Sequence, residues 1–203
     1  MKLCTLFLLM ATATVFSPGP GVVMTLTNAL RGGIRSTFGG ILGIAFGALI
    51  VAAISATSLG VLFAASAVAF SVVKFIGAAY LVYLGIRLWR SPPFQFAEQS
   101  ADDASLRRRF FEGLSLQLTN PKAIFFFLSV FPQFIDPQKS YSVQFAMLVL
   151  TYSSLVVVIH TIYAVFAKRA KGWLVSERGG RSVNKAAAAT FIFFGVALAT
   201  AKR

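Results

Sequence analysis

Acidic residues and cysteine are scarce in this sequence. Its 203 residues include only 6 aspartates and glutamates, and Cys4 is its one cysteine. A single thiol cannot form a disulfide within the chain or act as a redox pair. Charged residues of both signs make up 12% of the chain, whereas an average soluble domain has about 25%. A water-soluble globular protein and a thiol oxidoreductase are therefore not expected.

Acidic side chains are also absent from the interior of every long apolar run, since Glu112 and Asp136 stand only at the ends of runs. A serine hydrolase needs an acid beside its histidine, and a metal site needs a cluster of ligating side chains. We therefore expect no enzyme activity, no metal and no cofactor. A basic substrate would bring an unpartnered cation into a dry site. Neutral substrates are favoured, although backbone carbonyls or a tyrosine ring stay open as partners for a cation.

Apolar residues are abundant, at 57% of the chain, and the net charge is +13. Six apolar runs are visible, at about 3–30, 36–58, 66–89, 110–135, 142–166 and 186–201. A helix crosses a bilayer with about 20 apolar residues, so the runs predict six transmembrane helices, of which the last is short. Lys and Arg gather in the connections between runs, which indicates membrane topology rather than binding of nucleic acid. We expect the lipid bilayer, and no nucleic acid, as a partner.

The orientation in the membrane follows from these basic residues. They are concentrated in the connections after the first, third and fifth runs. Because basic loops stay in the cytoplasm, both termini are predicted to lie outside. The chain is expected to form a single transmembrane domain over 1–203, with a first repeat of about 1–90, a cytoplasmic loop of about 90–109 and a second repeat of about 110–203. Each repeat has an odd number of spans, so the two must insert with opposite orientation, as an inverted repeat.

The N-terminus has a second interpretation. Lys2, the apolar stretch to Phe16 and the small residues Ala11-Thr12-Ala13 resemble a cleavable signal peptide. Cleavage would leave too little apolar sequence after Ser17 to cross a bilayer, so we expect the first run to stay part of the domain.

Proline interrupts two of the apolar runs. Phe16-Ser17-Pro18-Gly19-Pro20-Gly21 interrupts the first run, and Leu118-Thr119-Asn120-Pro121-Lys122 interrupts the fourth. Proline removes an amide donor and clashes with the preceding helical turn. Broken backbone inside a bilayer is tolerated only where protein or a water-filled cavity covers it. Matching interruptions in two halves of a chain point to the binding site of a transporter.

Each interruption carries a capping residue before its proline, Ser17 before Pro18 and Asn120 before Pro121, which is typical of a helix start. We expect helices one and four to be broken near the midplane, with half-helix N-termini that approach each other and bind an anionic group. The substrate-binding candidates are Ser17, Pro18, Gly19, Pro20, Gly21, Thr119, Asn120, Pro121 and Lys122. A lysine at this depth costs about 2.5–3.5 kcal/mol, so Lys122 either binds a substrate carboxylate or donates to carbonyls that the break frees.

Two further polar residues lie within apolar runs. Lys74 is a candidate substrate or proton-coupling residue, with an interfacial lysine as the alternative. His160 titrates near neutral pH when unperturbed and is a candidate coupling residue, with a packed or interfacial histidine as the alternative.

Gly39, Gly43 and Gly47 form a stripe of small residues along one helix face. Such a stripe lets a neighbouring helix pack closely. We expect the first span to pack there, with a homodimer contact as the alternative.

Three stretches, taken in order, resemble the LysE/RhtB family of amino-acid exporters. They are Ser17-Pro18-Gly19-Pro20 followed by Ala29-Leu30-Arg31-Gly32-Gly33 and the glycines to Gly47, then Lys74-Phe75-Ile76-Gly77-Ala78-Ala79-Tyr80-Leu81 through Gly85, and finally Gly113 through Ala123. The resemblance covers nearly the whole chain. It implies a multi-pass protein of the bacterial cytoplasmic (inner) membrane that exports amino acids or their derivatives with the proton gradient. The stretch from Ala45 to Ala53 has no acidic residue of the kind associated with lysine-exporting members, which argues against lysine as the substrate.

We therefore expect a secondary transporter that exports neutral amino acids, or similar zwitterions, by proton antiport. Two alternatives stay open at this point. A membrane assembly subunit without flux would leave the two interruptions unexplained, and a membrane hydrolase using His160 would lack its acid.

Overall fold

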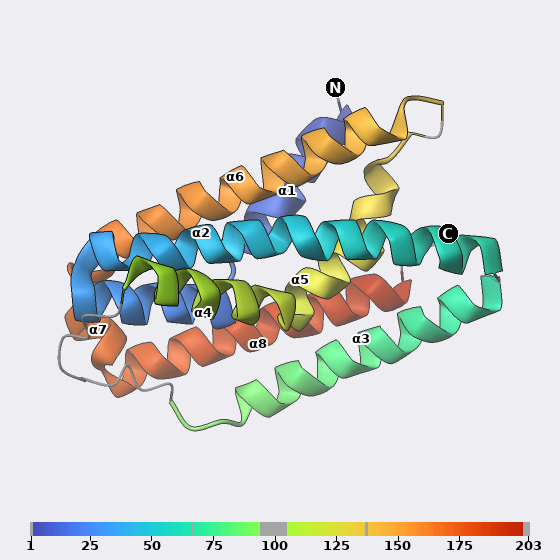
Figure 1. Cartoon of the computed structure of the whole chain (residues 1–203). Helices are drawn as coiled ribbons and strands as arrows, with labels where there is room; N and C mark the ends of the chain where they lie inside the picture. The colour runs from blue at the N-terminus through green and yellow to red at the C-terminus, as the bar shows by residue number, and fades with distance from the viewer. Residues whose placement is uncertain (1, 66, 94–104, 137, 201–203) are drawn as a thin grey trace.

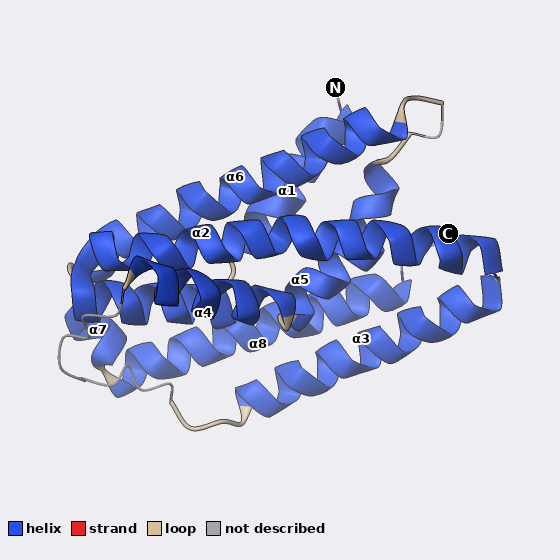
Figure 2. Ribbon diagram, in the orientation of Figure 1, coloured by secondary structure: helices blue, strands red, loops and turns tan. Residues whose placement is uncertain are grey.

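The computed structural model describes residues 2–65, 67–93, 105–136 and 138–200. Every regular element within these residues is helical (Figure 2), which confirms the predicted all-α class for the described part of the chain. The elements are α1 (Lys2–Phe16), α2 (Pro20–Ala65), α3 (Ala67–Trp89), α4 (Leu106–Leu118), α5 (Pro121–Phe125), the π-helical η1 (Phe126–Val130), the 3-10 helical η2 (Phe131–Phe134), α6 (Tyr141–Ala167), α7 (Lys171–Val175) and α8 (Glu177–Thr200). Most of the loop predicted at 90–109 lies outside the described residues.

Two stretches of helix are long and apolar enough to cross a bilayer, at Pro20–Ala56 and Tyr141–Ala167. Two shorter apolar helices cover Cys4–Phe16 and Phe75–Trp89. Length and composition alone are weak evidence, because the core helix of a soluble protein passes the same test. The six predicted spans therefore stay a prediction at this level.

The outer surface gives a stronger argument for a membrane. Large apolar side chains are exposed on several helices, with Leu9 64%, Ile76 65%, Leu150 59% and Phe193 65% exposed. A soluble monomer rarely exposes apolar patches larger than a few hundred Å². Such a surface on α1, α3, α6 and α8 is stable in contact with lipid tails.

A turn at Gly33 divides α2 into two helical parts, 20–32 and 34–65. Gly33 has φ 74° and ψ −173°, a conformation that residues with a Cβ rarely adopt. The hydroxyls of Ser36 and Thr37 donate to the Gly33 carbonyl at 3.1 and 2.8 Å, which fixes the start of the second part. The two parts pack on each other, since a Cβ on Gly40 would lie 2.9 Å from Met24 Cε. Residues 20–65 are therefore a helical hairpin, and the bend is visible at one end of α2 in Figure 1.

The glycine stripe of α2 packs against α4, so the expectation that it packs against the first span is wrong. A Cβ on Gly43 would lie 2.0 Å from the Phe110 carbonyl oxygen, and a Cβ on Gly47 would lie 2.8 Å from Gln117 Cβ. α4 contributes a glycine of its own, because a Cβ on Gly113 would lie 2.2 Å from the Gly40 carbonyl oxygen. Only helices with glycine on both sides can approach so closely, and α1 carries none.

The contact between α3 and α8 is reciprocal. A Cβ on Gly85 would meet Ile192 Cγ1 at 2.5 Å and the Ala188 carbonyl at 2.9 Å. A Cβ on Gly195 would meet Val82 Cγ2 at 2.7 Å and the Ala78 carbonyl at 2.9 Å. The two helices run side by side in Figure 1, and each uses its glycine to admit the backbone of the other.

α8 is longer than the apolar run 186–201 predicted. It begins at Glu177 and has 24 residues, because its first turns are polar on one side and pack with Val183 on the other. Asn184 in this polar part is buried and donates to the Pro92 carbonyl at 2.7 Å. The helix is therefore longer than the apolar run, which an amphipathic extension precedes, and the short sixth span stays a prediction.

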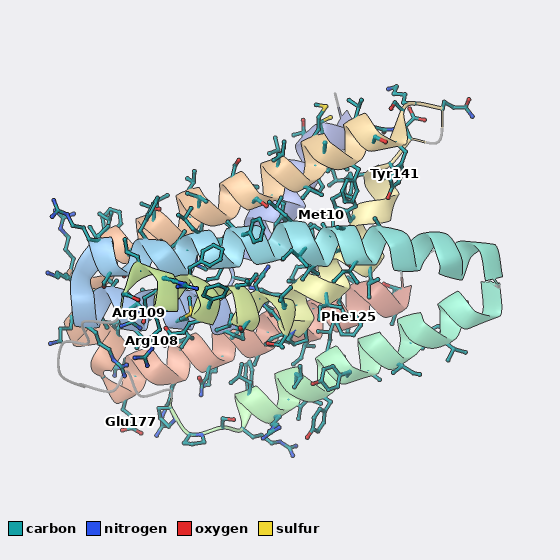
Figure 3. All side chains as sticks on the ribbon, viewed as in Figure 1. Met10, Arg108, Arg109, Phe125, Tyr141 and Glu177 are labelled. Atoms are coloured by element: carbon teal, nitrogen blue, oxygen red, sulfur yellow. The ribbon has the colours of Figure 1, made fainter. Side chains whose placement is uncertain are left out.

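The ends of the helices are unlike in charge. The bend of α2, the start of α4 and α7 lie together at the left of Figure 1, and the end of α2 and the start of α3 lie at the right. Arg108, Arg109 and Glu177, which Figure 3 labels, lie at the left end, whereas Tyr141 lies near the right. Arg108 and Arg109 thus lie at the same end of the molecule as the Gly33 turn and α7.

Candidate functional site

The first helix interruption lies between α1, which ends at Phe16, and α2, which begins at Pro20. Proline fits the first position of a helix because its missing amide has no partner there anyway. The prediction that Ser17 caps the following helix is wrong. Its hydroxyl points back to α1 and donates to the Thr14 carbonyl at 2.7 Å. Ser17 therefore belongs to the end of α1, and Pro18 and Gly19 separate it from Pro20, where α2 begins.

The second interruption lies between α4, which ends at Leu118, and α5, which begins at Pro121. Here the capping prediction agrees with the geometry, because the Asn120 side chain accepts from the Lys122 amide at 3.1 Å. Asn120 also donates to Gln117 Oε1 at 3.3 Å, and both side chains are buried. After α5 the chain continues as a π turn and a 3-10 turn rather than as a regular helix.

The Lys122 side chain joins the two interruptions. Its ammonium nitrogen donates to the carbonyls of Thr14 and Ser17, each at 2.9 Å, and to the Ser17 hydroxyl at 3.2 Å. An ammonium group has three donors, and these three acceptors use all of them. Gly19 makes the approach possible, because a Cβ on it would lie 3.0 Å from Lys122 Nζ. The sequence left two alternatives for Lys122, a substrate carboxylate or the carbonyls that the interruption frees. In this structure Lys122 contacts the carbonyls.

The charge of Lys122 has no acidic partner in the described part of the chain. The side chain is 8% exposed, and the groups that hold it are neutral oxygens at the end of α1. The C-terminal end of a helix carries a partial negative charge, which favours a cation there. That favourable field is weaker than that of a carboxylate, so a protonated Lys122 would have no full counter-charge among the described residues.

A second polar contact lies beside the first interruption. His160 of α6 is buried, and its Nδ1 is 2.7 Å from the Thr25 hydroxyl of α2. A Cβ on Gly21 would lie 3.2 Å from His160 Cε1, so the ring packs on the start of α2. Tyr163, one turn further along α6, donates its hydroxyl to the Phe16 carbonyl at 2.5 Å.

The structure thus brings together most, but not all, of the predicted site residues. Thr119 is exposed, and its hydroxyl donates to the Ser115 carbonyl at 2.9 Å rather than to the contact between the interruptions. Pro18 is half-buried and Pro20 is exposed. The backbone of Lys74 lies in α3, but its side chain is outside the described residues.

Three residues of this site were missed at the level of the sequence. Thr14 takes part through its backbone carbonyl, which any residue supplies, so no signal existed for it. Thr25 and Tyr163 had a signal, because Thr25 is one helical turn after Gly21 and Tyr163 one turn after His160.

These features define an integral membrane protein with an apolar exterior and a buried lysine where two helix interruptions meet. The family model for LysE type translocators matches residues 12–202. The chain therefore belongs to the LysE translocator family. This result confirms the family that the three sequence stretches suggested, and it assigns the protein to transporters rather than enzymes.

Curated relatives agree with this assignment over almost the full chain. The homoserine/homoserine lactone efflux proteins of Salmonella typhi and Salmonella typhimurium strain LT2 are each 35% identical over 196 residues, covering 97% of this chain and 95% of the relative. An uncharacterized membrane protein of Vibrio cholerae is 36% identical over 193 residues, covering 94% of each chain. No solved structure matches the chain.

Proposed function

We propose that this protein exports neutral amino acids or their derivatives from the cytoplasm across the bacterial inner membrane by proton antiport. The substrate binds where the two interruptions meet, and Lys122 is the residue that binds its carboxylate. The observation that carries the proposal is the buried side-chain nitrogen of Lys122, which lies between the end of α1 and the start of α5 and has no acidic partner among the described residues.

The contacts of Lys122 suggest how a zwitterion is bound. A substrate carboxylate attracts the ammonium of Lys122 away from the Thr14 and Ser17 carbonyls. The released carbonyls then accept from the substrate ammonium, so that each charge of the zwitterion finds a partner of opposite sign. The named relatives are described as efflux proteins for homoserine and homoserine lactone, of which homoserine is such a zwitterion. A basic amino acid would bring a second cation without a partner.

The architecture we propose for this function is six membrane-spanning helices in two inverted repeats, with helices one and four broken near the midplane. The reciprocal α3–α8 contact supports it. One shift in residue number maps Gly85 onto Gly195, Val82 onto Ile192 and Ala78 onto Ala188, and the same atoms meet on both sides. A two-fold axis between the repeats produces this pattern.

Residues on a two-fold axis touch their own equivalents, and the two interruptions behave in this way. Gly19 and Lys122 each follow the proline of their interruption, and they contact each other. In an inverted repeat, one axis would pass both between them and between α3 and α8. The candidate site would then lie at the centre of the transporter, where alternating access requires it.

The proposed orientation has both termini outside and the basic end of Figure 1 in the cytoplasm. Positively charged loops are retained on the cytoplasmic side during insertion. The Gly33 turn, the start of α4 and α7 then face the cytoplasm, from which substrate is taken.

We propose His160 as the proton-coupling residue, with Lys74 as the second candidate. The sequence has one histidine, His160. Imidazole is the side chain best suited to exchange protons near neutral pH. It packs on Gly21 beside the substrate site and bonds to Thr25. A proton bound there would repel the charge of Lys122, which couples protonation to the position of the ammonium group.

The test is uptake of labelled homoserine into inside-out membrane vesicles, with and without a pH gradient. Wild type is compared with Lys122→Ala, and Lys139→Ala is the matched control because Lys139 is an exposed lysine with a side chain 72% exposed. We expect gradient-dependent uptake that falls at least tenfold in Lys122→Ala and is unchanged in Lys139→Ala. Uptake that survives in Lys122→Ala would leave an exporter with a structural lysine. Absence of uptake for every amino acid in folded wild-type protein would refute the proposed function.

A further inference from the structure

A second polar cluster lies at the basic end of the molecule, away from the interruptions. Arg109 in the first turns of α4 is 3% exposed, and its Nη1 donates to Asn28 Oδ1 of α2 at 2.5 Å. The same Nη1 lies 3.4 Å from Glu112 Oε2, a carboxylate that is 36% exposed. Figure 3 shows Arg109 beside Arg108 at the end of α4.

Asn28 and Arg31, one turn apart in α2, each have a buried donor without an acceptor among the described residues. Asn28 is 3% exposed, and its Nδ2 has no hydrogen-bond partner among the described residues. Arg31, one turn later in α2, has a buried Nε in the same situation. An unsatisfied buried donor costs its full desolvation free energy, and such groups are rare in proteins unless something else binds them. Both missing partners are acceptors, and beside the guanidinium groups of Arg31 and Arg109 an anionic acceptor is favoured over a neutral one.

The start of α4 adds to the attraction for an anion. Its first turn holds basic residues and no acidic one, at the end of the helix where the amides already point outward. Cations at this end oppose the helix dipole. An anion bound there would be stabilised by the basic side chains and by the helix dipole. Glu112 provides a single opposite charge, at the exposed side of the cluster.

Asn28 is connected to the substrate site by the face of its own helix. Gly21, Thr25 and Asn28 follow one another at spacings of four and three, so they share one face, and all three are buried. Gly21 and Thr25 contact His160, and Asn28 contacts Arg109. The helix face that carries Thr25 and Asn28 thus extends from the first interruption to the contact with Arg109.

We propose that Asn28, Arg31 and Arg109 form a capture site for the carboxylate of the amino-acid substrate, and that Glu112 binds its ammonium group. This inference rests on the proposed function, since it places a second, cytoplasmic binding step before the site at Lys122. The substrate class is an α-amino acid in its zwitterionic form.

The experiment compares two probes in vesicles that expose the cytoplasmic face. Homoserine has a carboxylate and an ammonium group, whereas homoserine lactone has the amino group and no carboxylate. The variant is Asn28→Asp, which keeps the oxygen that Arg109 donates to, removes the Nδ2 donor and adds a negative charge. Arg108→Gln is the control, because Arg108 is 66% exposed and pairs with the same Glu112.

We expect Asn28→Asp to raise KM for homoserine about tenfold, the loss typical of one charge-assisted hydrogen bond, and to leave KM for the lactone within twofold. Glu112→Gln should raise KM for both probes, and Arg108→Gln for neither. If Asn28→Asp does not fold, Arg31→Gln removes the other unpaired donor and should give the same split between the probes.

A purely structural contact between α2 and α4 gives a different result. It predicts equal changes for the two probes, or a lower Vmax with unchanged KM, and either outcome overturns the proposal. A split that disappears in vesicles without anionic lipid also overturns it, because the donors then serve a lipid headgroup. Homoserine uptake by wild type is measured in the same experiment, so failure of the proposed function is seen separately.

Discussion

The interruption between α1 and α2 and the interruption between α4 and α5 use the same proline chemistry but differ in charge. Each has a proline after a small polar residue, and the next residue is Gly19 in the first and Lys122 in the second. The lysine extends into the space that the glycine leaves empty, and its ammonium takes the free carbonyls at the end of α1. The comparison teaches that the lysine side chain fits between the two interruptions because the residue that faces it is a glycine.

The largest effect is expected from filling that vacancy. Gly19→Lys places a second ammonium beside the first, where three acceptors already serve one cation. We expect a loss of stability of about 3 kcal/mol, the cost of an uncompensated charge at this depth, together with loss of transport. Thermal unfolding of the purified protein in detergent measures the first, and vesicle uptake measures the second. Gly172→Lys is the control, because Gly172 is exposed with open space around it.

A double exchange tests whether the two positions are equivalent. In Gly19→Lys/Lys122→Gly the single cation moves to the first interruption, where Gln117 and Asn120 are the counterparts of Thr14 and Ser17. We expect the double variant to regain much of the stability that Gly19→Lys loses. A double variant no more stable than Gly19→Lys alone would show that the positions are not interchangeable.

Gly85 of α3 and Gly195 of α8 can be compared in the same way, at a contact that involves no charged residue. Gly85→Leu and Gly195→Leu each force a side chain against the backbone of the other helix, at positions where even a Cβ lies within 2.9 Å of the Ala188 or Ala78 carbonyl. We expect each to cost about 1–3 kcal/mol, as overpacking does, and the two costs to agree within experimental error. Thermal midpoints in detergent measure this, with Gly172→Leu as the control. Clearly unequal costs would contradict the two-fold relation of the halves.

Local chemistry made some parts of this structure predictable from the sequence. Proline and glycine act on their own few residues, and α1 ends at Phe16 directly before the Ser17-Pro18 pair. Asn120 caps α5 because the cap and the amide it accepts from are two residues apart. The helical class follows from apolar runs of membrane length.

Features that depend on distant partners were not predictable in this way. The sequence shows the stripe from Gly39 to Gly47, but its partner is decided by Gly113, which lies far along the chain in α4. The sequence also shows Lys122, but whether it contacts a carbonyl or a carboxylate depends on where α1 ends in space. Ser17 was assigned to the wrong helix. Serine favours a helix start, but its hydroxyl can also donate to a carbonyl of the preceding turn, as it does here to Thr14.

A smaller effect is expected at the contact between Thr25 and His160, which lies beside the first interruption. Thr25→Val keeps the shape of the side chain and removes the hydroxyl, so His160 Nδ1 is left buried without its partner. We expect a loss of about 1–3 kcal/mol for the unsatisfied group, and a smaller loss in Thr25→Ser, which keeps the hydroxyl. If His160 couples protons, the ratio of gradient-driven to gradient-free uptake also falls in Thr25→Val. A variant that loses stability while that ratio is unchanged would make His160 a packing residue.

The smallest effects are expected at Ser17 and Asn120, the residues that precede the prolines, and they should differ between the two. Asn120→Ala removes a helix cap and should cost about 1 kcal/mol, with little change in KM for homoserine, because the amide it serves is a structural one. Ser17→Ala removes no cap. It removes one of the three acceptors of Lys122 and the hydroxyl that donates to Thr14, so the ammonium is held less firmly. We therefore expect Ser17→Ala to change KM for homoserine severalfold at a similar or smaller cost in thermal stability. Parallel titrations of uptake and thermal unfolding measure the pair, and identical patterns in the two variants would mean that both residues only stabilise helix ends.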